Sequence, residues 1–82
     1  MRATVLVRPK HGILDPQGEA VTNSLQHLGF GVTDVRVGRL IDVELPEAGA
    51  AQTRAEVERM CEQLLANPLI ESYEIAVEPE RT

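Results

Sequence analysis

The side chains able to perform acid/base, nucleophilic or metal chemistry do not form a catalytic pattern in this sequence. His11 and His27 lie far apart, and neither has a second histidine at metal-ligand spacing. Asp15 directly precedes Pro16, a pair typical of a helix N-cap followed by the first helical residue. Cys61 lies among apolar residues, where a thiol is buried and poorly reactive. We therefore expect no catalytic residue, bound cofactor or metal in this chain.

One small group of basic residues remains to be explained. Arg8, Lys10 and His11 follow one another closely and could hold a phosphate or an acidic partner, although solvated loop charges are more common. The glycines do not form the G-x-x-x-x-G-K pattern of a phosphate-binding loop. Nucleotide binding by this chain alone therefore has no motif behind it.

The composition is that of one small globular domain, spanning 1–82, with an aliphatic core. The chain is 43% hydrophobic, but it contains one Tyr, one Phe and no Trp. Its 13 acidic and 8 basic residues give a net charge of -5, which argues against nucleic acid and membrane surfaces as partners. One cysteine and the lack of a long apolar run predict a cytoplasmic protein.

The N-terminal part of the sequence predicts a strand followed by a helix. Residues 2–8 alternate apolar and polar side chains and are ended by Pro9. A helix then begins at Asp15-Pro16 and ends at Gly29, which can adopt the left-handed conformation. Its apolar stripe is narrow, consisting of Val21, Leu25 and Leu28.

Residues 32–45 show an unbroken two-residue alternation that continues through Gly38. This pattern favours one long strand, bent at the glycine, over a hairpin at Gly38-Arg39, but the alternation alone allows both. A strand of this length would extend beyond a small domain and offer an edge to a partner.

The C-terminal half predicts a second helix and a last strand. Thr53 and Glu56 have the spacing of a capping box, and Asn67-Pro68 ends the helix. The apolar stripe consists of Val57, Met60, Cys61, Leu64 and Leu65. Residues 71–78 alternate as a half-buried strand.

Together these elements predict an α+β fold of βαβαβ or βαββαβ order. Two helices are expected on one face of a mainly antiparallel sheet, an arrangement related to the ferredoxin-like sandwich. The opposite face, with Leu6 and Leu40 among charged residues, has no element left to cover it. A second copy of the chain is the simplest cover, which predicts a homodimer, possibly paired further into a tetramer.

Several segments of the sequence resemble the PurS family, the small subunit of phosphoribosylformylglycinamidine synthase. They span nearly the whole chain and comprise the run Gly12-Ile-Leu-Asp-Pro-Gln-Gly18, then Leu28-Gly-Phe30, then Val35-Arg-Val-Gly-Arg39, and the helix end Met60-Cys-Glu-Gln-Leu-Leu-Ala-Asn-Pro-Leu-Ile-Glu71.

The resemblance implies a non-catalytic subunit that bridges the synthetase and glutaminase subunits of this enzyme in purine biosynthesis. Ammonia released from glutamine would then reach formylglycinamide ribonucleotide, with ATP and Mg held by the synthetase and none by this chain. As a hypothesis, the surface for the partner or second copy consists of Leu6, Arg8, Lys10, His11, Arg36, Arg39 and Leu40.

A function of another class also fits a small ferredoxin-like domain. Such domains can be regulatory modules that bind a small effector at a dimer interface, as ACT domains do. A regulator of that kind would bind its effector without other subunits, whereas an assembly subunit would not.

Overall fold

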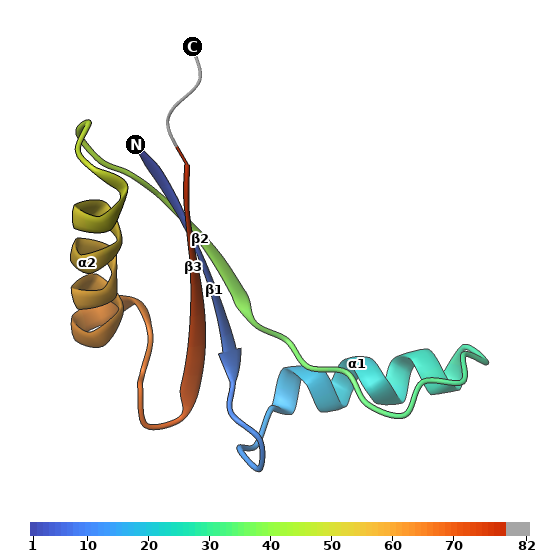
Figure 1. Cartoon of the computed structure of the whole chain (residues 1–82). Coiled ribbons are helices and arrows are strands. Elements are labelled where there is room, and N and C mark those ends of the chain that lie inside the picture. Colours follow the sequence, from blue (N-terminus) through green and yellow to red (C-terminus); the bar gives the residue numbers. More distant parts are fainter. Residues whose placement is uncertain (79–82) are drawn as a thin grey trace.

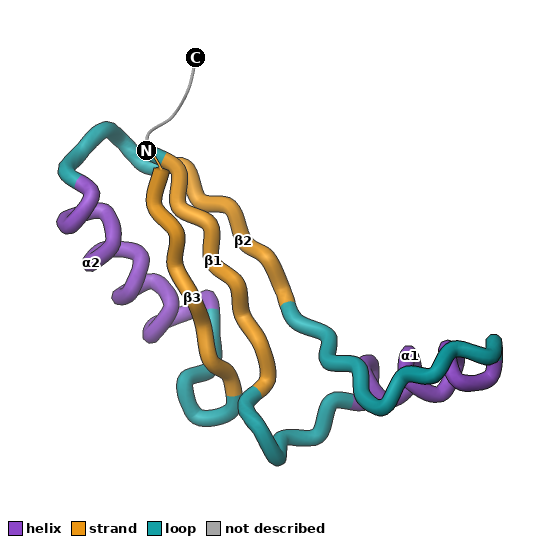
Figure 2. The backbone as a smooth tube through the Cα atoms, turned by 45° about the vertical axis from the view of Figure 1, so that its right-hand side comes forward, coloured by secondary structure: helices purple, strands orange, loops and turns teal. Residues whose placement is uncertain are grey.

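The computed structural model describes residues 1–78 as a three-stranded antiparallel sheet with two helices. The sheet has the order β2-β1-β3, with β1 in the centre (Figures 1 and 2). The elements are β1 (Arg2–Pro9), α1 (Pro16–His27), β2 (Arg39–Glu44), α2 (Ala50–Met60), the short π-helical η1 (Cys61–Leu65) and β3 (Glu71–Glu78). The predicted α+β class is confirmed, in the βαβαβ order.

The core lies between the sheet and α2. Because β1 is central, its inward side chains Ala3, Val5 and Val7 are fully enclosed, and from the helical side Val57 and Cys61 pack against them. The half-buried residues of the edge strands complete this layer, as the alternation predicted: Ile41, Val43, Tyr73, Ile75 and Val77. Burying each aliphatic side chain contributes roughly 1.5–3 kcal/mol, so this one layer supplies most of the stabilisation.

The other face of the sheet carries alternating polar and apolar side chains. In the antiparallel register Leu6 lies opposite Leu40 on β2 and Glu74 on β3. Leu40 is 61% exposed. Figure 1 shows α2 on one side of the strands only. The predicted uncovered face is therefore present in this chain.

Helix α1 has the predicted ends but continues beyond the sheet. Asp15 caps its first turn, and Gly29 (φ +96°) lets the N–H of Phe30 donate to the carbonyl oxygen of Leu25 at 3.0 Å. Figures 1 and 2 show α1 and the returning segment 30–38 running side by side, away from the end of the sheet. We call α1 together with 30–38 the arm.

The arm makes the molecule extended for its length. The radius of gyration is 16.1 Å, and the principal dimensions are 48 × 32 × 14 Å. A compact domain of this size would have a radius of gyration of about 12 Å. Of the two helices, α2 covers the core, whereas α1 projects.

The predicted strand over 32–45 is wrong in its first half, because β2 begins at Arg39. Its pairing with β1 ends where Arg39 faces Val7, and β1 itself ends at Pro9. Earlier residues have no strand beside them and run along α1 instead. The hairpin alternative is also wrong, because Gly38 lacks the positive φ of a tight hairpin turn. An extended segment keeps a two-residue period whether or not it belongs to a sheet.

Two expectations for the second helix are also corrected. The helix begins at Ala50 with Gly49 as its N-cap, so Thr53 is not a cap but a buried residue of the helix. At the other end the N–H of Ala66 donates to the carbonyl oxygen of Cys61, five residues earlier. This wider π turn changes the phase of the helix. Leu64 is therefore 83% exposed, and Ala66 is buried.

No helix within residues 1–78 combines the length and apolarity needed to span a bilayer.

The close approach of Gly38 to β1 gives a stability prediction. A Cβ added at Gly38 would clash with the carbonyl oxygen of Val7, which belongs to the backbone and cannot move aside. We expect Gly38→Ala to lower the free energy of unfolding by about 1–3 kcal/mol, the usual cost of overpacking. Urea unfolding followed by circular dichroism measures this.

Gly31→Ala is the matched control, because a Cβ there meets open space. We expect this variant to be neutral or more stable by up to about 1 kcal/mol, through reduced freedom of the unfolded chain. Equal stabilities of the two variants would contradict the packing assigned to Gly38.

Candidate interaction surface at the elbow of the arm

Five of the seven residues predicted for a partner surface line one pocket. It has a volume of about 320 Å³ and lies where β1 and β2 meet the arm, a junction that we call the elbow. The predicted residues in it are Leu6, Arg8, Arg36, Arg39 and Leu40. Lys10 and His11 follow in the adjacent exposed loop. The structure therefore brings the predicted set together, and its contact with a partner stays a prediction.

Most of the basic side chains in this set are also held by the chain itself. Arg8 forms an ion pair with Glu74 at 3.3 Å. Lys10 donates through Nζ to the carbonyl oxygen of Pro68 at 2.6 Å. Arg36 donates through Nη2 to the carbonyl oxygens of Pro9 at 2.7 Å and Lys10 at 2.8 Å. Carbonyl oxygens are uncharged, so these bonds fix Lys10 and Arg36 in place without neutralising them.

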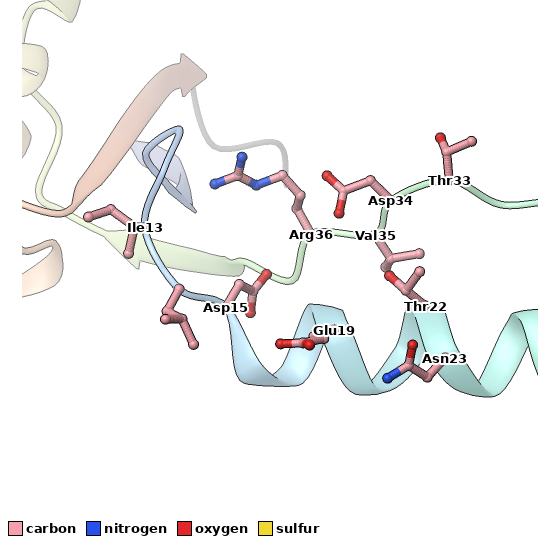
Figure 3. A pocket seen from close by; sticks show the side chains of 10 residues that line it. Ile13, Asp15, Glu19, Thr22, Asn23, Thr33, Asp34, Val35 and Arg36 are labelled. Carbon is pink, nitrogen blue, oxygen red and sulfur yellow. The ribbon is translucent and has the colours of Figure 1, made fainter.

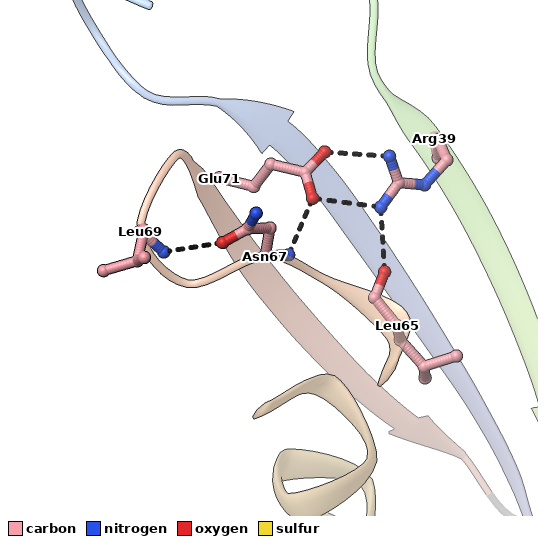
Figure 4. Close-up of polar contacts among 5 residues, drawn as sticks. All are labelled: Arg39, Leu65, Asn67, Leu69 and Glu71. Carbon is pink, nitrogen blue, oxygen red and sulfur yellow. Dashed lines mark hydrogen bonds and ion pairs between the residues drawn. The ribbon is translucent and has the colours of Figure 1, made fainter. Parts of the chain in front are cut away.

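Arg39 connects the two edge strands across the end of β1 (Figure 4). Its guanidinium makes a bidentate pair with Glu71, at 2.8 Å and 3.2 Å, and donates to the carbonyl oxygen of Leu65 at 2.8 Å. The backbone N–H of Asn67 donates to the same carboxylate at 2.8 Å. The guanidinium and this N–H lower the pKa of Glu71, and the carboxylate raises the pKa of Arg39.

Asp15 has a second role that sequence reasoning missed. Its Oδ1 accepts from the N–H of Gly18 at 3.0 Å, which is the predicted cap. Its Oδ2 accepts from the N–H of Val37 at 2.9 Å, on the returning segment. The bond from Val37, then that from Gly18, and the nearby charge of Arg36 lower the pKa of Asp15. Local sequence gives no signal for a bond to a residue so far along the chain.

A second pocket, of about 370 Å³, lies inside the arm between α1 and the segment 33–36 (Figure 3). Glu19 and Asn23 line it from α1, and Asp34 and Arg36 line it from the opposite segment. These groups could hydrogen-bond a polar molecule, but the lining contains no thiol or histidine. Sequence analysis did not predict this pocket, because its two walls are distant in the chain.

The remaining candidates for chemistry lie apart from one another. His11 is exposed in the loop after β1, and His27 is exposed in the last turn of α1. Cys61 is fully buried, and burial is the main cause that raises the pKa of its thiol. Within residues 1–78 no three His, Cys, Asp or Glu side chains are placed to hold a metal ion.

Several large apolar side chains are exposed that the sequence analysis did not assign to a surface. Leu28 and Phe30 lie at the far end of the arm and are 73% and 59% exposed. Leu14 and Leu69 lie in the loops near the elbow and are 80% and 84% exposed. Large apolar side chains exposed at the far end of the arm and near the elbow are typical of a protein that works in contact with others.

A sheet covered on one side, a projecting arm and exposed apolar side chains are features of a small assembly subunit. Comparison with known proteins agrees. Residues 2–79 match the family model PurS, described as phosphoribosylformylglycinamidine (FGAM) synthase. The chain belongs to the PurS family, so it is a non-catalytic subunit of that enzyme of purine biosynthesis, and the resemblance found in the sequence is confirmed.

Similar proteins match over nearly their full length. The subunit PurS of Methanocaldococcus jannaschii is 41% identical over 78 residues, which cover 94% of each chain. The crystal structure of M. jannaschii PurS has a TM-score of 0.86 over 98% of each chain. A chain in the structure of PurLQS from Thermotoga maritima has a TM-score of 0.82 at 29% identity, over 92% of this chain and 93% of that one.

The Arg39–Glu71 pair gives a pH-dependent stability prediction. Because the pKa of Glu71 is lower in the folded than in the unfolded chain, its stabilisation is complete above the unfolded value of 4.5 and is lost as the pH falls below it. At pH 6 we expect Glu71→Gln to lower the free energy of unfolding by about 1 kcal/mol. The difference from wild type should shrink toward pH 3, as measured by urea unfolding.

Glu58→Gln, at an exposed position of α2, is the control for the same change in charge. The side chain of Glu58 takes no part in the bonds to Arg39, so this variant should retain the Arg39–Glu71 pair and its stabilisation. If Glu71→Gln stayed equally destabilising from pH 6 to pH 3, ionisation of Glu71 would not be the source of the effect.

Proposed function

We propose that this chain joins the synthetase and glutaminase subunits of FGAM synthase and keeps their active sites at a fixed separation. The observation that carries the proposal is the match to a chain of the solved PurLQS structure, which covers 93% of that chain. The comparisons favour this role over the effector-binding regulator, because the relatives are named as subunits of the synthase.

The shape of the chain supports a bridging role. Its longest dimension is 48 Å and its thickness is 14 Å, so surfaces at its two ends are well separated. One surface is the uncovered sheet face around Leu40, beside the elbow, and the other is the far end of the arm with Leu28 and Phe30, about one helix length away. A protein of this form can contact two partners without bringing them into contact with each other.

The chemistry of ammonia explains why such an adaptor matters. Ammonia that diffuses into water is diluted and protonated, so direct delivery between active sites preserves the reactive form. In this proposal ATP and Mg are bound by the synthetase, glutamine is hydrolysed by the glutaminase, and this chain binds none of them. We also propose that the chain is located in the cytoplasm, together with the soluble substrates of the pathway.

We also infer that the chain works as a homodimer that can pair further into a tetramer. The sheet face opposite α2 carries Leu6 and the exposed Leu40 side by side in register. Around them lie Arg8, paired with Glu74, and Thr4, which donates to Asp42 at 2.8 Å. An apolar centre with a polar rim suits the self-complementary interface of a two-fold dimer.

Reconstitution tests the bridging role. We expect the synthetase and glutaminase to couple glutamine hydrolysis to FGAM formation only when this chain is added, whereas formation from added ammonium chloride should need it much less. Product formed per glutamine hydrolysed is the measurement. Full coupling by the two larger subunits alone would contradict the proposal.

The combined variant His27→Ala and Cys61→Ala, at two residues outside the predicted partner surface, is a control for a hidden catalytic role. After a check of folding by circular dichroism, this variant should restore coupling at a rate near that of the wild-type chain. Complete loss of product formation with both glutamine and ammonium chloride would point instead to chemistry performed by one of these residues.

Sedimentation equilibrium tests the homodimer and its surface. We expect the wild-type chain to sediment at twice the monomer mass at micromolar concentration, and Leu40→Glu to shift it toward monomer, because burying an unpaired carboxylate is unfavourable. Leu64→Glu is the matched control, since Leu64 is even more exposed but follows α2 on the other side of the sheet. A monomeric wild-type chain, or dissociation by the Leu64 variant alone, would contradict the assignment.

A further inference from the structure

We propose that Asp15 and Arg36 are positioning residues that lock the direction of the arm relative to the sheet. This inference rests on the proposed bridging function and deepens it. The direction of the arm is then what this chain contributes to the coupling of the two active sites. Four observations at the elbow support the proposal.

The first observation is that Asp15 joins three segments with one carboxylate. It sits between the β1–α1 loop and the first turn of α1, and it accepts from the N–H of Gly18 at 3.0 Å. Its other oxygen accepts from the N–H of Val37 at 2.9 Å, two residues before the start of β2. The bond to Val37 therefore ties the base of the helix to the returning segment at the point where that segment enters the sheet.

The second observation is that Arg36 makes the reciprocal connection. From the returning segment it donates to the carbonyl oxygens of Pro9 and Lys10, at the end of β1 and in the following loop. Lys10 is itself fixed, because its N–H donates to the carbonyl oxygen of Ile70 at 2.9 Å and its Nζ donates to that of Pro68. Two segments connect the arm to the sheet, namely the β1–α1 loop and the end of the returning segment. They are thus bonded to each other and to the loop before β3.

The third observation is the tight packing of two glycines at the same place. A Cβ at Gly18 would clash with the carbonyl oxygen of Val35, and a Cβ at Gly38 would clash with that of Val7. The Gly18 contact packs α1 against the returning segment inside the arm, and the Gly38 contact packs that segment against β1. The second contact crosses the elbow, where backbone against backbone leaves little room for the arm to rotate.

The fourth observation is that the arm is a unit of its own beyond this point. Gln26 donates through Nε2 to the carbonyl oxygen of Val32 at 3.0 Å, which holds α1 to the returning segment. Figures 1 and 2 show the arm extending past the end of the sheet, where α2 does not reach it. Its direction therefore depends on the elbow.

The length of the arm makes its direction important. Helix α1 has 12 residues and is therefore about 18 Å long. A rotation of about 10° at the elbow would move the far end of a helix of this length by about 3 Å. Since misplacement by about 1 Å can reduce a reaction rate 100-fold, a displacement of this size at Leu28 and Phe30 would disturb a fixed arrangement of two active sites.

The variants are chosen to loosen the elbow without removing the helix. Asp15→Asn keeps an oxygen for the cap on Gly18, because Asn is as good an N-cap as Asp, but it places an amide N–H₂ toward the N–H of Val37. Arg36→Gln removes the bonds to Pro9 and Lys10. Arg36→Lys keeps one cation that can reach the same carbonyl oxygens and serves as the conservative rescue.

Matched controls make the same chemical changes elsewhere. Asp34→Asn changes an exposed carboxylate on the same segment of the arm, and Arg59→Gln changes an exposed arginine of α2. Neither side chain takes part in the elbow bonds described above. All variants are first compared by circular dichroism and urea unfolding.

The first measurement reports on the arm directly. Nitroxide labels are attached at Ser24→Cys in α1 and Ser72→Cys in β3, and pulsed electron paramagnetic resonance gives the distribution of distances between the two labels. An excess of unlabelled chain ensures that each distance is measured within one copy of the chain. Cys61 is fully buried and is left unlabelled under native conditions. We expect one narrow distribution in wild type and in both controls, and a broadened one in Asp15→Asn and Arg36→Gln, with Arg36→Lys narrower than Arg36→Gln.

The second measurement is product formed per glutamine hydrolysed in the reconstituted complex, at equal occupancy of the complex by each variant. We expect Asp15→Asn and Arg36→Gln to lower this ratio by about threefold or more, since delivery depends on geometry. Product formed from ammonium chloride should change little. A variant that had merely lost stability would show reduced occupancy rather than a reduced ratio.

The outcomes separate this inference from the proposed function. A narrow distance distribution in Asp15→Asn and Arg36→Gln would overturn the lock at the elbow, even if the wild-type chain couples the two reactions. A broadened distribution with an unchanged ratio would overturn the importance of the arm's direction. If the wild-type chain did not raise the ratio at all, the bridging function and this inference would fall together.

Discussion

The burial of β1 on one side is the constraint on which the rest of this small protein depends. Ala3, Val5 and Val7 are enclosed by two neighbouring strands and by Val57 and Cys61. A chain of 82 residues has enough apolar surface for one such layer, and α2 already provides its cover. The second face of the sheet and the other helix are therefore left uncovered by this chain. These uncovered surfaces suit the molecule to assembly with other subunits.

The arm explains how a domain without catalytic groups can serve a reaction. Its surface offers apolar side chains at the far end, while its base is held by the bond that Asp15 accepts from Val37 and by the bonds that Arg36 donates to Pro9 and Lys10. In most small domains a helix of this kind is stabilised by packing on the sheet. Here the elbow replaces that packing with polar bonds and close backbone contacts, so the helix is held firmly but its sides stay free. In the proposed function, geometry rather than reactivity is what this subunit supplies.

The family motif around Asp15 gains a physical meaning from the structure. Pro16 begins α1 without an N–H to satisfy, and the carboxylate of Asp15 accepts from two segments. Gly18 is the one buried residue of the helix, because the carbonyl oxygen of Val35 lies against it. A carboxylate next to a proline is explained by capping alone when the sequence is considered locally. Its longer-range bond shows why the same few residues also determine where the returning segment runs.

The sequence by itself determined the elements whose signals are local. The alternation of apolar and polar residues located β1 and β3. The start at Asp15-Pro16 and the end at Gly29 located α1, and Asn67-Pro68 marked the end of the second helical region. These signals are local, because caps and periodicity act over a few neighbouring residues. The composition also determined that the core is aliphatic. Only the tertiary structure decided that 32–38 runs beside α1 instead of extending β2, since the same extended backbone and alternation serve either role and the choice depends on which element lies alongside. It also decided the π turn that exposes Leu64, and the meeting of Leu6, Arg8, Arg36, Arg39 and Leu40 around one pocket, because these depend on contacts between residues far apart in the chain.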